Sequence, residues 1–224
     1  MTSNDARFVV GVDEAGRGAW IGPLVVGAVA IAANGVERLR DAGARDSKLL
    51  SPARREEVYQ RIEEIGMTRS IELPPSEIDR HVVHGRLNDL EARTFGQIVR
   101  EFAPVRAFVD ACDTDPSRFG RRVSKEAGPG VQVVSRHHAD RLFPLVGAAS
   151  IVAKVWRDRA MANLGASLGC DVGSGYPSDA RTVEFVTAHV RANAARPAWL
   201  RESWATTQRI IPALPTRTLD RFDR

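Results

Sequence analysis

The stretch from Phe8 to Ile31 constrains the fold more than any other part of this 224-residue chain. Two runs rich in β-branched apolar residues, Phe8 to Val12 and Leu24 to Ile31, flank a segment that contains two adjacent acids, several glycines and a proline. Apolar runs separated by turn-forming residues predict a strand, a turn and a second strand. We expect the first strand to end where the acids begin.

Asp13 and Glu14 are those two acids. A carboxylate at the edge of a core is costly unless a cation, a partner group or solvent compensates its charge. A divalent metal is one such cation, and a hairpin whose acids face water is the simpler alternative; the local pattern does not separate the two. Gly16-Arg17-Gly18 follows, and its two glycines permit positive φ on either side of one guanidinium. Backbone amides that come close to a ligand beside a cation suit a phosphodiester.

Composition places the chain among globular proteins, with 43% hydrophobic and 27% charged residues and a net charge of +4. The small basic excess fits a polyanionic partner, but many proteins without such a partner share it. Cys112 and Cys170 form no Cys-x-x-Cys pair, which argues against a zinc knuckle or a disulfide framework and favours a reducing compartment. The N-terminus lacks an apolar signal core and the longest apolar run is too short to span a bilayer. We therefore expect a cytoplasmic protein with no membrane partner.

The length fits one large domain, or one domain with an appendage, at about 150 residues per domain. We expect a single domain over residues 1–211 that includes a helical C-terminal segment. Residues 212–224 contain two prolines, few large apolar groups and alternating charges, which predicts a flexible tail.

Two further acids lie near predicted strands. Residues 105–110 form a predicted strand that ends at Asp110, and ligands gather at the carboxyl ends of strands in sheets with parallel pairing. We therefore expect Asp13 and Asp110 to be neighbours. Asp140 follows a short predicted strand over residues 131–135 and precedes a predicted helix. Its carboxylate could stabilise the N-terminal end of that helix through the helix dipole, or it could bind a metal, and the sequence leaves both interpretations open.

Several polar residues have competing interpretations. We expect Asp113 to be a solvated loop residue. His137 and His138 could in principle bind zinc, but adjacent histidines in a strand point to opposite faces, which disfavours a shared metal. Ser47 and Lys48 belong to a polar triplet that fits either turn chemistry or phosphate binding.

The predicted helix over residues 145–164 carries Ser150, Lys154 and Arg157 at spacings of four and three, so these side chains share one face. An exposed helical face is the commoner explanation for such a polar ridge. Beyond this helix, Tyr176 lies in a loop rich in glycine and proline. A ring on a stiff loop suits stacking on a sugar or base, and packing of the ring under its own loop is the alternative.

Six segments, taken in order over about residues 8–182, strongly resemble the ribonuclease HII family. They are Val-Asp-Glu-Ala-Gly-Arg-Gly with Ile-Gly-Pro-Leu-Val-Val-Gly, Asp-Ser-Lys-Leu-Leu-Ser, Val109-Asp110, Ala139-Asp140, the run Ala148–Asp158, and Gly-Ser-Gly-Tyr-Pro-Ser-Asp. The last of these segments and the run Val-Asp-Ala-Cys-Asp resemble the archaeal branch of the family more than the common bacterial one. Family members usually carry a lysine two residues before the fourth acid, where this chain has His138, so a phosphate contact there is expected to be weaker or pH dependent. The short N-terminus argues against the related ribonuclease HIII.

This resemblance implies an α/β ribonuclease H-like fold, in which helices flank a central mixed β-sheet and a helical C-terminal segment follows. It implies an endonuclease that hydrolyses the RNA strand of RNA·DNA hybrids and cleaves at ribonucleotides embedded in duplex DNA, leaving 5′-phosphate and 3′-hydroxyl ends. The family's catalytic acids, which are also its metal ligands, carry over to Asp13, Glu14, Asp110 and Asp140. Two Mg²⁺ or Mn²⁺ ions would relieve the repulsion among these carboxylates and supply the chemistry.

The resemblance also implies the substrate contacts. Gly16, Arg17 and Gly18 are expected to read the 2′-hydroxyl at the RNA-to-DNA junction, because that group alone separates RNA from DNA there. Tyr176 is expected to stack on the following deoxyribose. The remaining candidates for substrate binding are Ser47, Lys48, Ser150 and Lys154.

We expect a monomer whose partners are RNA·DNA hybrids and DNA duplexes containing ribonucleotides. A sliding clamp has no motif in the predicted tail to support it as a partner. Two rival functions remain: a hybrid-binding module without catalysis, and another metal nuclease of similar fold, such as a junction resolvase or an exonuclease. The rival module has no use for four acids, and the rival nuclease has no need of the Gly-Arg-Gly and tyrosine pairing.

Overall fold

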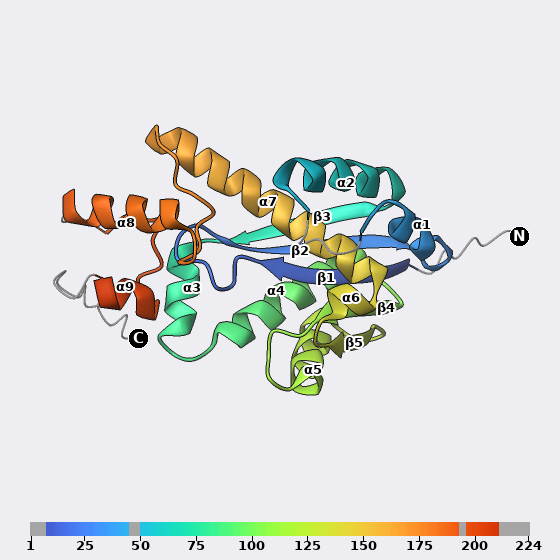
Figure 1. The fold of residues 1–224 in the computed structure, drawn as a ribbon. Coiled ribbons are helices and arrows are strands. Elements are labelled where there is room, and N and C mark those ends of the chain that lie inside the picture. Colours follow the sequence, from blue (N-terminus) through green and yellow to red (C-terminus); the bar gives the residue numbers. More distant parts are fainter. Residues whose placement is uncertain (1–7, 45–49, 193–195, 211–224) are drawn as a thin grey trace, which may run out of the picture.

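The computed structural model describes residues 8–44, 50–192 and 196–210, and within these ranges a mixed five-stranded sheet forms the centre of the molecule (Figure 1). The strands are β1 (Phe8–Ala15), β2 (Leu24–Ala32), β3 (Met67–Leu73), β4 (Arg106–Asp110) and β5 (Gln132–Arg136). Their order is β3-β2-β1-β4-β5, with antiparallel pairing from β3 to β1 and parallel pairing from β1 to β5. The strand-turn-strand prediction and the mixed sheet are both confirmed.

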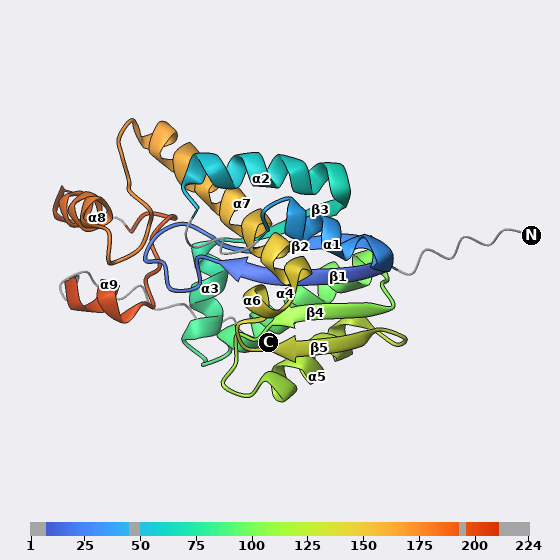
Figure 2. The ribbon, with the colours of Figure 1, turned by 45° about the vertical axis from the view of Figure 1, so that its right-hand side comes forward.

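Helices cover both faces of this sheet (Figures 1 and 2). They are α1 (Val36–Asp41), α2 (Pro52–Ile65), α3 (Pro75–Val82), α4 (Leu87–Phe102), α5 (Pro116–Ala127), α6 (Ala139–Leu142), α7 (Pro144–Leu168), α8 (Ala180–Ala192) and α9 (Ala205–Ile210), with a short 3₁₀ turn η1 (Ala33–Gly35) before α1. One face packs against α1, α2 and α7, and the other packs against α4 and α5. None of the helices that the structure describes is both long and apolar enough to cross a membrane.

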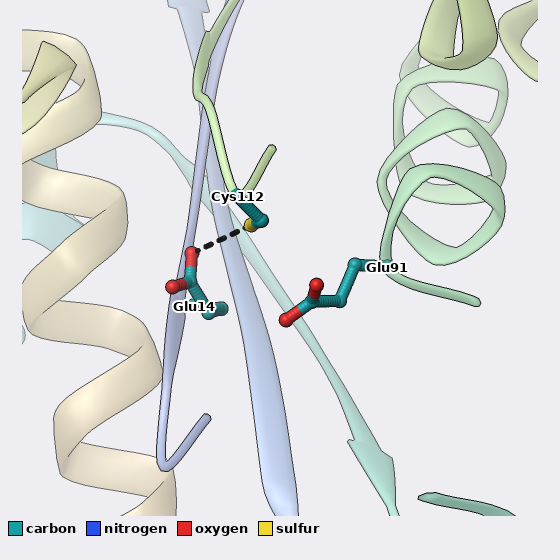
Figure 3. Close-up of side chains that lie close together, drawn as sticks. All are labelled: Glu14, Glu91 and Cys112. Carbon is teal, nitrogen blue, oxygen red and sulfur yellow. Dashed lines mark hydrogen bonds between the residues drawn. The ribbon is translucent and has the colours of Figure 1, made fainter. Parts of the chain in front are cut away.

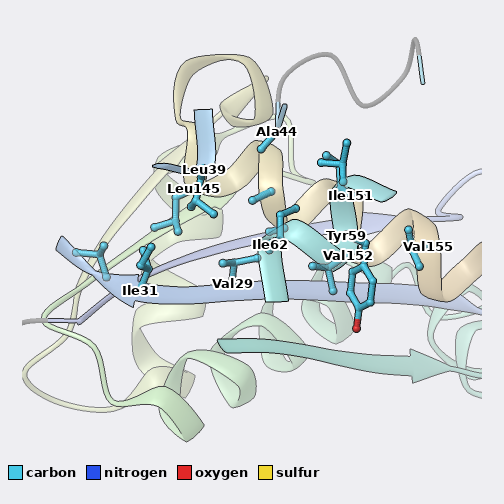
Figure 4. Close-up of a cluster of buried hydrophobic side chains, with 14 residues drawn as sticks. Val29, Ile31, Leu39, Ala44, Tyr59, Ile62, Leu145, Ile151, Val152 and Val155 are labelled. Carbon is cyan, nitrogen blue, oxygen red and sulfur yellow. The ribbon is translucent and has the colours of Figure 1, made fainter. Parts of the chain in front are cut away.

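The apolar core between the sheet and α7 sets the position of the site (Figure 4). Val29 and Ile31 of β2 face Leu145 and Val152 of α7 in this core. Gly11 allows the close approach, because a Cβ atom at this position would lie 2.3 Å from the carbonyl oxygen of Leu145. The helix therefore lies directly against β1 and carries its polar residues to the carboxyl end of that strand.

A second core, on the opposite face, joins β1 and β4 to α4 and α5. Phe95 and Phe119 meet edge to face there, with ring centroids 5.4 Å apart. Phe95 belongs to a buried apolar stripe of α4, which also includes Ile98 and Val99. Burial of this apolar stripe, more than helix propensity, holds α4 in position.

The C-terminal helix α8 belongs to a smaller apolar cluster beside the loop that joins β1 to β2, and α9 is tied to the same loop by a hydrogen bond. Trp20 and Ile21 from that loop pack against Val186 and Leu200. The indole of Trp20 donates a hydrogen bond to the hydroxyl of Thr207 at 2.7 Å. The predicted helical C-terminal segment is thus present and packs on the β1–β2 loop.

Two details of the prediction were wrong. β1 does not end at Val12: Asp13 and Glu14 lie inside the strand, paired with Gly27 and Val26, because the long apolar run of β2 extends the ladder past the acids. Asp113 is not solvated, since its side chain is buried and paired with Arg118. Residues 45–49 and 211–224 are outside the described ranges, so the predicted roles of Ser47 and Lys48 and the predicted tail are not addressed by the structure.

Candidate active site

Three of the four predicted metal ligands meet at the carboxyl ends of β1 and β4. Carboxylate oxygens of Asp13, Glu14 and Asp110 lie within 4.8 Å of one another. The two strands are parallel neighbours, with Val12 opposite Val109, so the acids that follow these residues are adjacent. A buried carboxylate cluster of this kind repels itself strongly unless cations or protons neutralise it.

Asp140 approaches this cluster from α6. The backbone N–H of Ala139 donates a hydrogen bond to Asp110 at 2.7 Å, which ties the start of α6 to the end of β4. Asp140 lines the same cavity as Asp13 and Asp110, a hollow of about 450 Å³. It is the second residue of α6 and does not cap that helix; the N-cap is His138, which has φ 55° and makes no side-chain capping bond.

The adjacent histidines do not lie in a strand. β5 ends at Arg136, and His137 and His138 form the exposed turn that leads to α6. The geometry that was expected to point them to opposite faces is therefore absent, although neither joins a described group of potential metal ligands.

The electrostatics of the cluster favour cation binding. Burial raises the pKa of Asp13 well above its usual value, the charge of Glu14 raises it further, and the Lys154 ammonium opposes this shift. Burial also raises the pKa of Glu14 to about 7, with contributions from the charges of Glu91 and Asp110. Without cations these acids hold protons that free carboxylates would lose, and a divalent ion would displace those protons.

Glu14 also belongs to a second cluster, with Glu91 and Cys112 (Figure 3). The Cys112 thiol donates to Glu14 at 3.3 Å, and burial raises its pKa well above the usual value, so it stays protonated. Glu91 is buried on α4 and is paired with the Arg17 guanidinium at 2.9 Å. A protonated thiol and a neutralised acid make a poor site for a hard cation, which prefers oxygen ligands such as those of the first cluster.

The Gly-Arg-Gly loop borders the cavity between the carboxylates and α7. Gly16 has φ 88°, and a Cβ atom there would lie 2.4 Å from Nε of Arg157, so this position requires glycine. Arg17 donates through Nη2 to Asn88 at 2.7 Å in addition to its ion pair. Gly18, contrary to the expectation, does not have positive φ; it is exposed, and a Cβ atom there would have no neighbouring atom within 4 Å.

The polar face of α7 is buried, so its interpretation as an exposed helical face was wrong. Ser150 has no exposed surface, and it accepts a hydrogen bond from Lys154, which reaches the cavity. Arg157 is 3% exposed and donates to the carbonyl of Ser174 at 3.0 Å. Its guanidinium carbon lies 4.9 Å from the ring centroid of Tyr176, which lines the same cavity as Gly16.

Two buried residues that hold the Gly-Arg-Gly loop in place, Glu91 and Arg201, were not identified from the sequence. Glu91 lies on the apolar stripe of α4, and a charged residue on such a stripe is a recognisable signal of a buried partner. Arg201 is fully buried; it donates to the carbonyl oxygen of Gly22 at 3.1 Å and to that of Arg17 at 3.0 Å. Nothing in the local sequence marks this contact, because its partners are backbone atoms about 180 residues away.

Known proteins share this sequence and this fold. The family model described as "Ribonuclease HII" matches residues 10–207. A ribonuclease HII from Cenarchaeum symbiosum is 46% identical over 88% of this chain and 95% of its own. The crystal structure of ribonuclease H2 from Pyrococcus horikoshii superposes with a TM-score of 0.83 at 39% identity, covering 91% of this chain and 96% of that one.

A second solved relative is the ribonuclease HII of Archaeoglobus fulgidus in its complex with PCNA. It superposes with a TM-score of 0.81 at 38% identity and covers 88% of this chain and 95% of that chain. The more distant Bst-RNase HIII, solved in complex with Mn²⁺, has a TM-score of 0.74 at 22% identity, covers 92% of this chain and 70% of that one, and supports the fold alone.

The family match spans most of the described residues, and these archaeal relatives are similar over nearly their whole length. The predicted ribonuclease H-like fold and the archaeal-like branch are confirmed. The chain belongs to the ribonuclease HII family, the metal-dependent endoribonucleases that cleave the RNA of RNA·DNA hybrids and ribonucleotides embedded in duplex DNA.

Proposed function

We propose that Asp13, Glu14, Asp110 and Asp140 hold two divalent ions, Mg²⁺ or Mn²⁺, and that this chain uses them to cleave ribonucleotide-containing strands. The observation that carries the proposal is the all-oxygen cluster of three carboxylates at the ends of two adjacent parallel strands, with a fourth in the same cavity. Oxygen donors in this number suit both ions. When bound, such ions activate a water and stabilise the departing 3′ oxygen.

The protein's own residues orient the scissile strand in this proposal. Asp13 and Asp110 are fixed by backbone hydrogen bonds from Glu14 and Ala139, so the ligand set is preorganised. Lys154 reaches the cavity from α7 and places one cation beside the phosphate. Ser150 is buried behind Lys154, and we propose that it acts on a substrate by holding that ammonium.

We assign recognition of the ribonucleotide to the Gly-Arg-Gly loop and Tyr176, which line the same cavity as the acids. We propose that the backbone of Gly16 and Gly18, with Arg17 between them, contacts the 2′-hydroxyl, and that Tyr176 packs on the following deoxyribose. In support, all of these residues line the carboxylate cavity. Arg157 links the two parts, because it lies under Gly16 and against the ring of Tyr176. Ser47 and Lys48, in an undescribed stretch, remain proposed phosphate contacts.

Two labelled duplexes test the function. One is all DNA, and the other is the same sequence with a single ribonucleotide; each is incubated with Mg²⁺, Mn²⁺ or a chelator. We expect cleavage of the second duplex alone, only with metal, leaving a 3′-hydroxyl and a 5′-phosphate. Cleavage of the all-DNA duplex would indicate a nuclease of another specificity, and metal-insensitive binding without cleavage would indicate a hybrid-binding module.

A sliding clamp is a further candidate partner, since the relative from Archaeoglobus fulgidus is in complex with PCNA. Size-exclusion chromatography with light scattering tests this proposal and the predicted monomer together. The chain alone should elute at the mass of one copy, and a mixture with the clamp should contain a heavier species. Separate elution of the two proteins at micromolar concentration would remove the clamp from the proposal.

A further inference from the structure

A broad groove lies outside the carboxylate cavity, on the face of the molecule that carries α3, α4 and α5. Its volume is about 820 Å³, larger than the 450 Å³ of the carboxylate cavity. Five Lys and Arg side chains line it, against three acids. The proposed cleavage reaction makes no use of this surface.

Most of the cations in this groove have no acidic partner. Arg122 is paired with Asp89 at 2.9 Å. Among the residues that the structure describes, no ion pair involves Arg80, Arg86, Arg93 or Lys125, all of which are exposed. The two other acids of the lining, Glu77 and Glu126, leave a positive excess. A concave surface with an excess of unpaired cations concentrates a positive potential, which attracts polyanions.

The first turns of α4 lie between the groove and the Gly-Arg-Gly loop and contribute residues to both. Arg86, the residue before α4, and Asp89 line the groove, while Asn88 and Glu91 from the same turns hold the Arg17 guanidinium. Successive residues of a helix point in different directions, so one helix end contributes to both surfaces. A ligand that contacts the Gly-Arg-Gly loop therefore needs to extend by little more than the width of α4 to reach the groove.

We propose that this groove binds the sugar-phosphate backbone of the duplex that flanks the cleavage site. The proposal rests on the proposed function, because it requires a nucleic acid duplex in the carboxylate cavity. Arg86 and Arg93 are separated by about 10 Å along α4 at a rise of about 1.5 Å per residue. That distance corresponds to about three base pairs at about 3.4 Å per base pair along one strand. The two guanidiniums can therefore contact separate phosphates of one strand.

The test compares a groove variant with a control of equal charge. The groove variant is Arg86→Ala with Arg93→Ala. The control is Arg38→Ala with Arg61→Ala, two exposed arginines of α1 and α2 that make no described ion pair and lie on the other face of the sheet. Both variants are assayed on three duplexes. One is a short duplex centred on a single ribonucleotide, and each of the other two is that duplex extended by ten base pairs on one side only.

We expect the groove variant to bind one of the two extended duplexes, the one whose added base pairs reach the groove, about ten-fold more weakly than the control does at low salt. The slope of log K against log salt should become shallower by about two, since each lost phosphate contact contributes about 0.9. Cleavage of the short duplex, and kcat on every duplex, should match the control. Melting temperatures of both variants should stay near that of the unsubstituted protein, because none of the four side chains is buried.

The outcomes separate this inference from the proposed function. If the unsubstituted protein cleaves the ribonucleotide duplex but the groove variant and the control have equal affinity and salt slope on both extended duplexes, the groove does not bind the flank. An equal loss on the short and the extended duplexes would also overturn the inference, since the groove would then act on the cleavage site. If the unsubstituted protein cleaves no duplex, the proposed function fails instead.

Discussion

Each clustered carboxylate is held by a different neighbour, so substitutions that preserve shape should change charge and little else. Asp13 accepts from the backbone of Glu14, Asp110 from that of Ala139, and Glu14 from the thiol of Cys112. An asparagine can still accept a hydrogen bond through its carbonyl oxygen. Such substitutions therefore separate the proposed metal-binding role of these residues from their part in the fold.

Asp13→Asn and Asp110→Asn should each reduce kcat by several orders of magnitude, because each removes a charge that the cations need. Melting temperature should change little or rise, since a buried repulsive charge is lost. Binding of an RNA·DNA hybrid should survive. Near-normal turnover by both variants at saturating Mg²⁺ would contradict the two-metal proposal.

Asp140 calls for a separate test, because its oxygens are not among those that lie within 4.8 Å of one another. If it is a ligand, Asp140→Asn should lower kcat far more than stability. If Asp140 only interacts favourably with the dipole of α6, the substitution should lower the free energy of unfolding by about 0.3 to 1 kcal/mol and leave activity nearly intact. Urea unfolding beside steady-state kinetics distinguishes the two.

Tyr176 should matter most where a deoxyribose follows the ribonucleotide. Tyr176→Ala removes the ring and should cost about 1 to 3 kcal/mol of stacking, measured as a loss of kcat/KM on a duplex with one ribonucleotide. The loss on a continuous hybrid should be smaller, and Tyr176→Phe should restore most of it, because the stacking face remains. Equal losses on both substrates would instead mean that the ring serves mainly to pack against Arg157.

At the scale of elements, the β1–β2 loop is fastened from two sides. The first turns of α4 hold the side chain of Arg17 through Asn88 and Glu91. The segment before α9 holds its backbone through Arg201, which also lies 5.0 Å from the ring centroid of Trp204. Recognition of a small group such as a 2′-hydroxyl requires a backbone that does not shift, and these contacts supply that rigidity.

Arg201→Ala should therefore destabilise the protein by about 3 kcal/mol, because it leaves buried carbonyl oxygens of Arg17 and Gly22 without their donor. Arg201→Lys should recover only part of this, since an ammonium cannot reach both carbonyls with the same fork. Urea denaturation measures the first effect. Discrimination between ribonucleotide and all-DNA duplexes, measured at a temperature where the variant is folded, should also weaken; unchanged discrimination would show that the loop is rigid without Arg201.

The elements show what a single sequence can reveal. The caps of α2 and α5 are local signals, because the side chains of Ser51 and Asp115 accept hydrogen bonds from backbone N–H groups in the first turns of these helices, and the apolar stripe of α4 is equally local. β3 was missed because its residues alternate imperfectly and stay partly exposed at a sheet edge. The burial of Arg157 was missed for a different reason: its guanidinium contacts a loop 17 residues further along the chain, which periodicity does not report.

The candidate site was predictable to a similar degree. Acids after apolar runs pointed to Asp13 and Asp110 without any knowledge of a family, and parallel pairing accounts for their proximity. The local sequence left Asp140 between a helix-dipole role and a metal ligand, and Tyr176 between stacking and packing; the resemblance favoured the metal ligand and the stacking role. Glu91 was marked only as a charged residue on an apolar stripe, which does not identify Arg17 as its partner. Arg201 could not be assigned, because its partners are backbone oxygens far away in the sequence.

At the scale of the molecule, the buried acids make stability depend on pH and on metal. Burial raises the pKa of both Glu14 and Glu91 from 4.5 to about 7 in the folded protein. Between these values the unfolded chain binds fewer protons than the folded one, so folding stability falls as pH rises. As far as these groups decide, a metal-free sample should keep its full stability up to about pH 4.5, lose stability as the pH rises toward 7, and level off above that pH.

Saturating Mg²⁺ should flatten this dependence above pH 6, because the ion binds the deprotonated cluster and replaces the lost protons. Thermal unfolding at several pH values, with and without Mg²⁺, measures both effects. Glu14→Gln should show a shallower decline than the unsubstituted protein when metal is absent. A metal-free protein whose stability is level from pH 5 to 8 would contradict the raised pKa values.

The central position of β1 has a consequence for how the chain is made. Its antiparallel partner β2 leaves the ribosome directly after it, but its parallel partner β4 is about 100 residues further along. Because synthesis proceeds at about 5 to 20 residues per second, one edge of β1 therefore stays without its partner strand for about 5 to 20 seconds. Through that interval Asp110 has not yet been made, so the carboxylate cluster is incomplete, and under the proposed function the nascent chain should not cleave the nucleic acids around it.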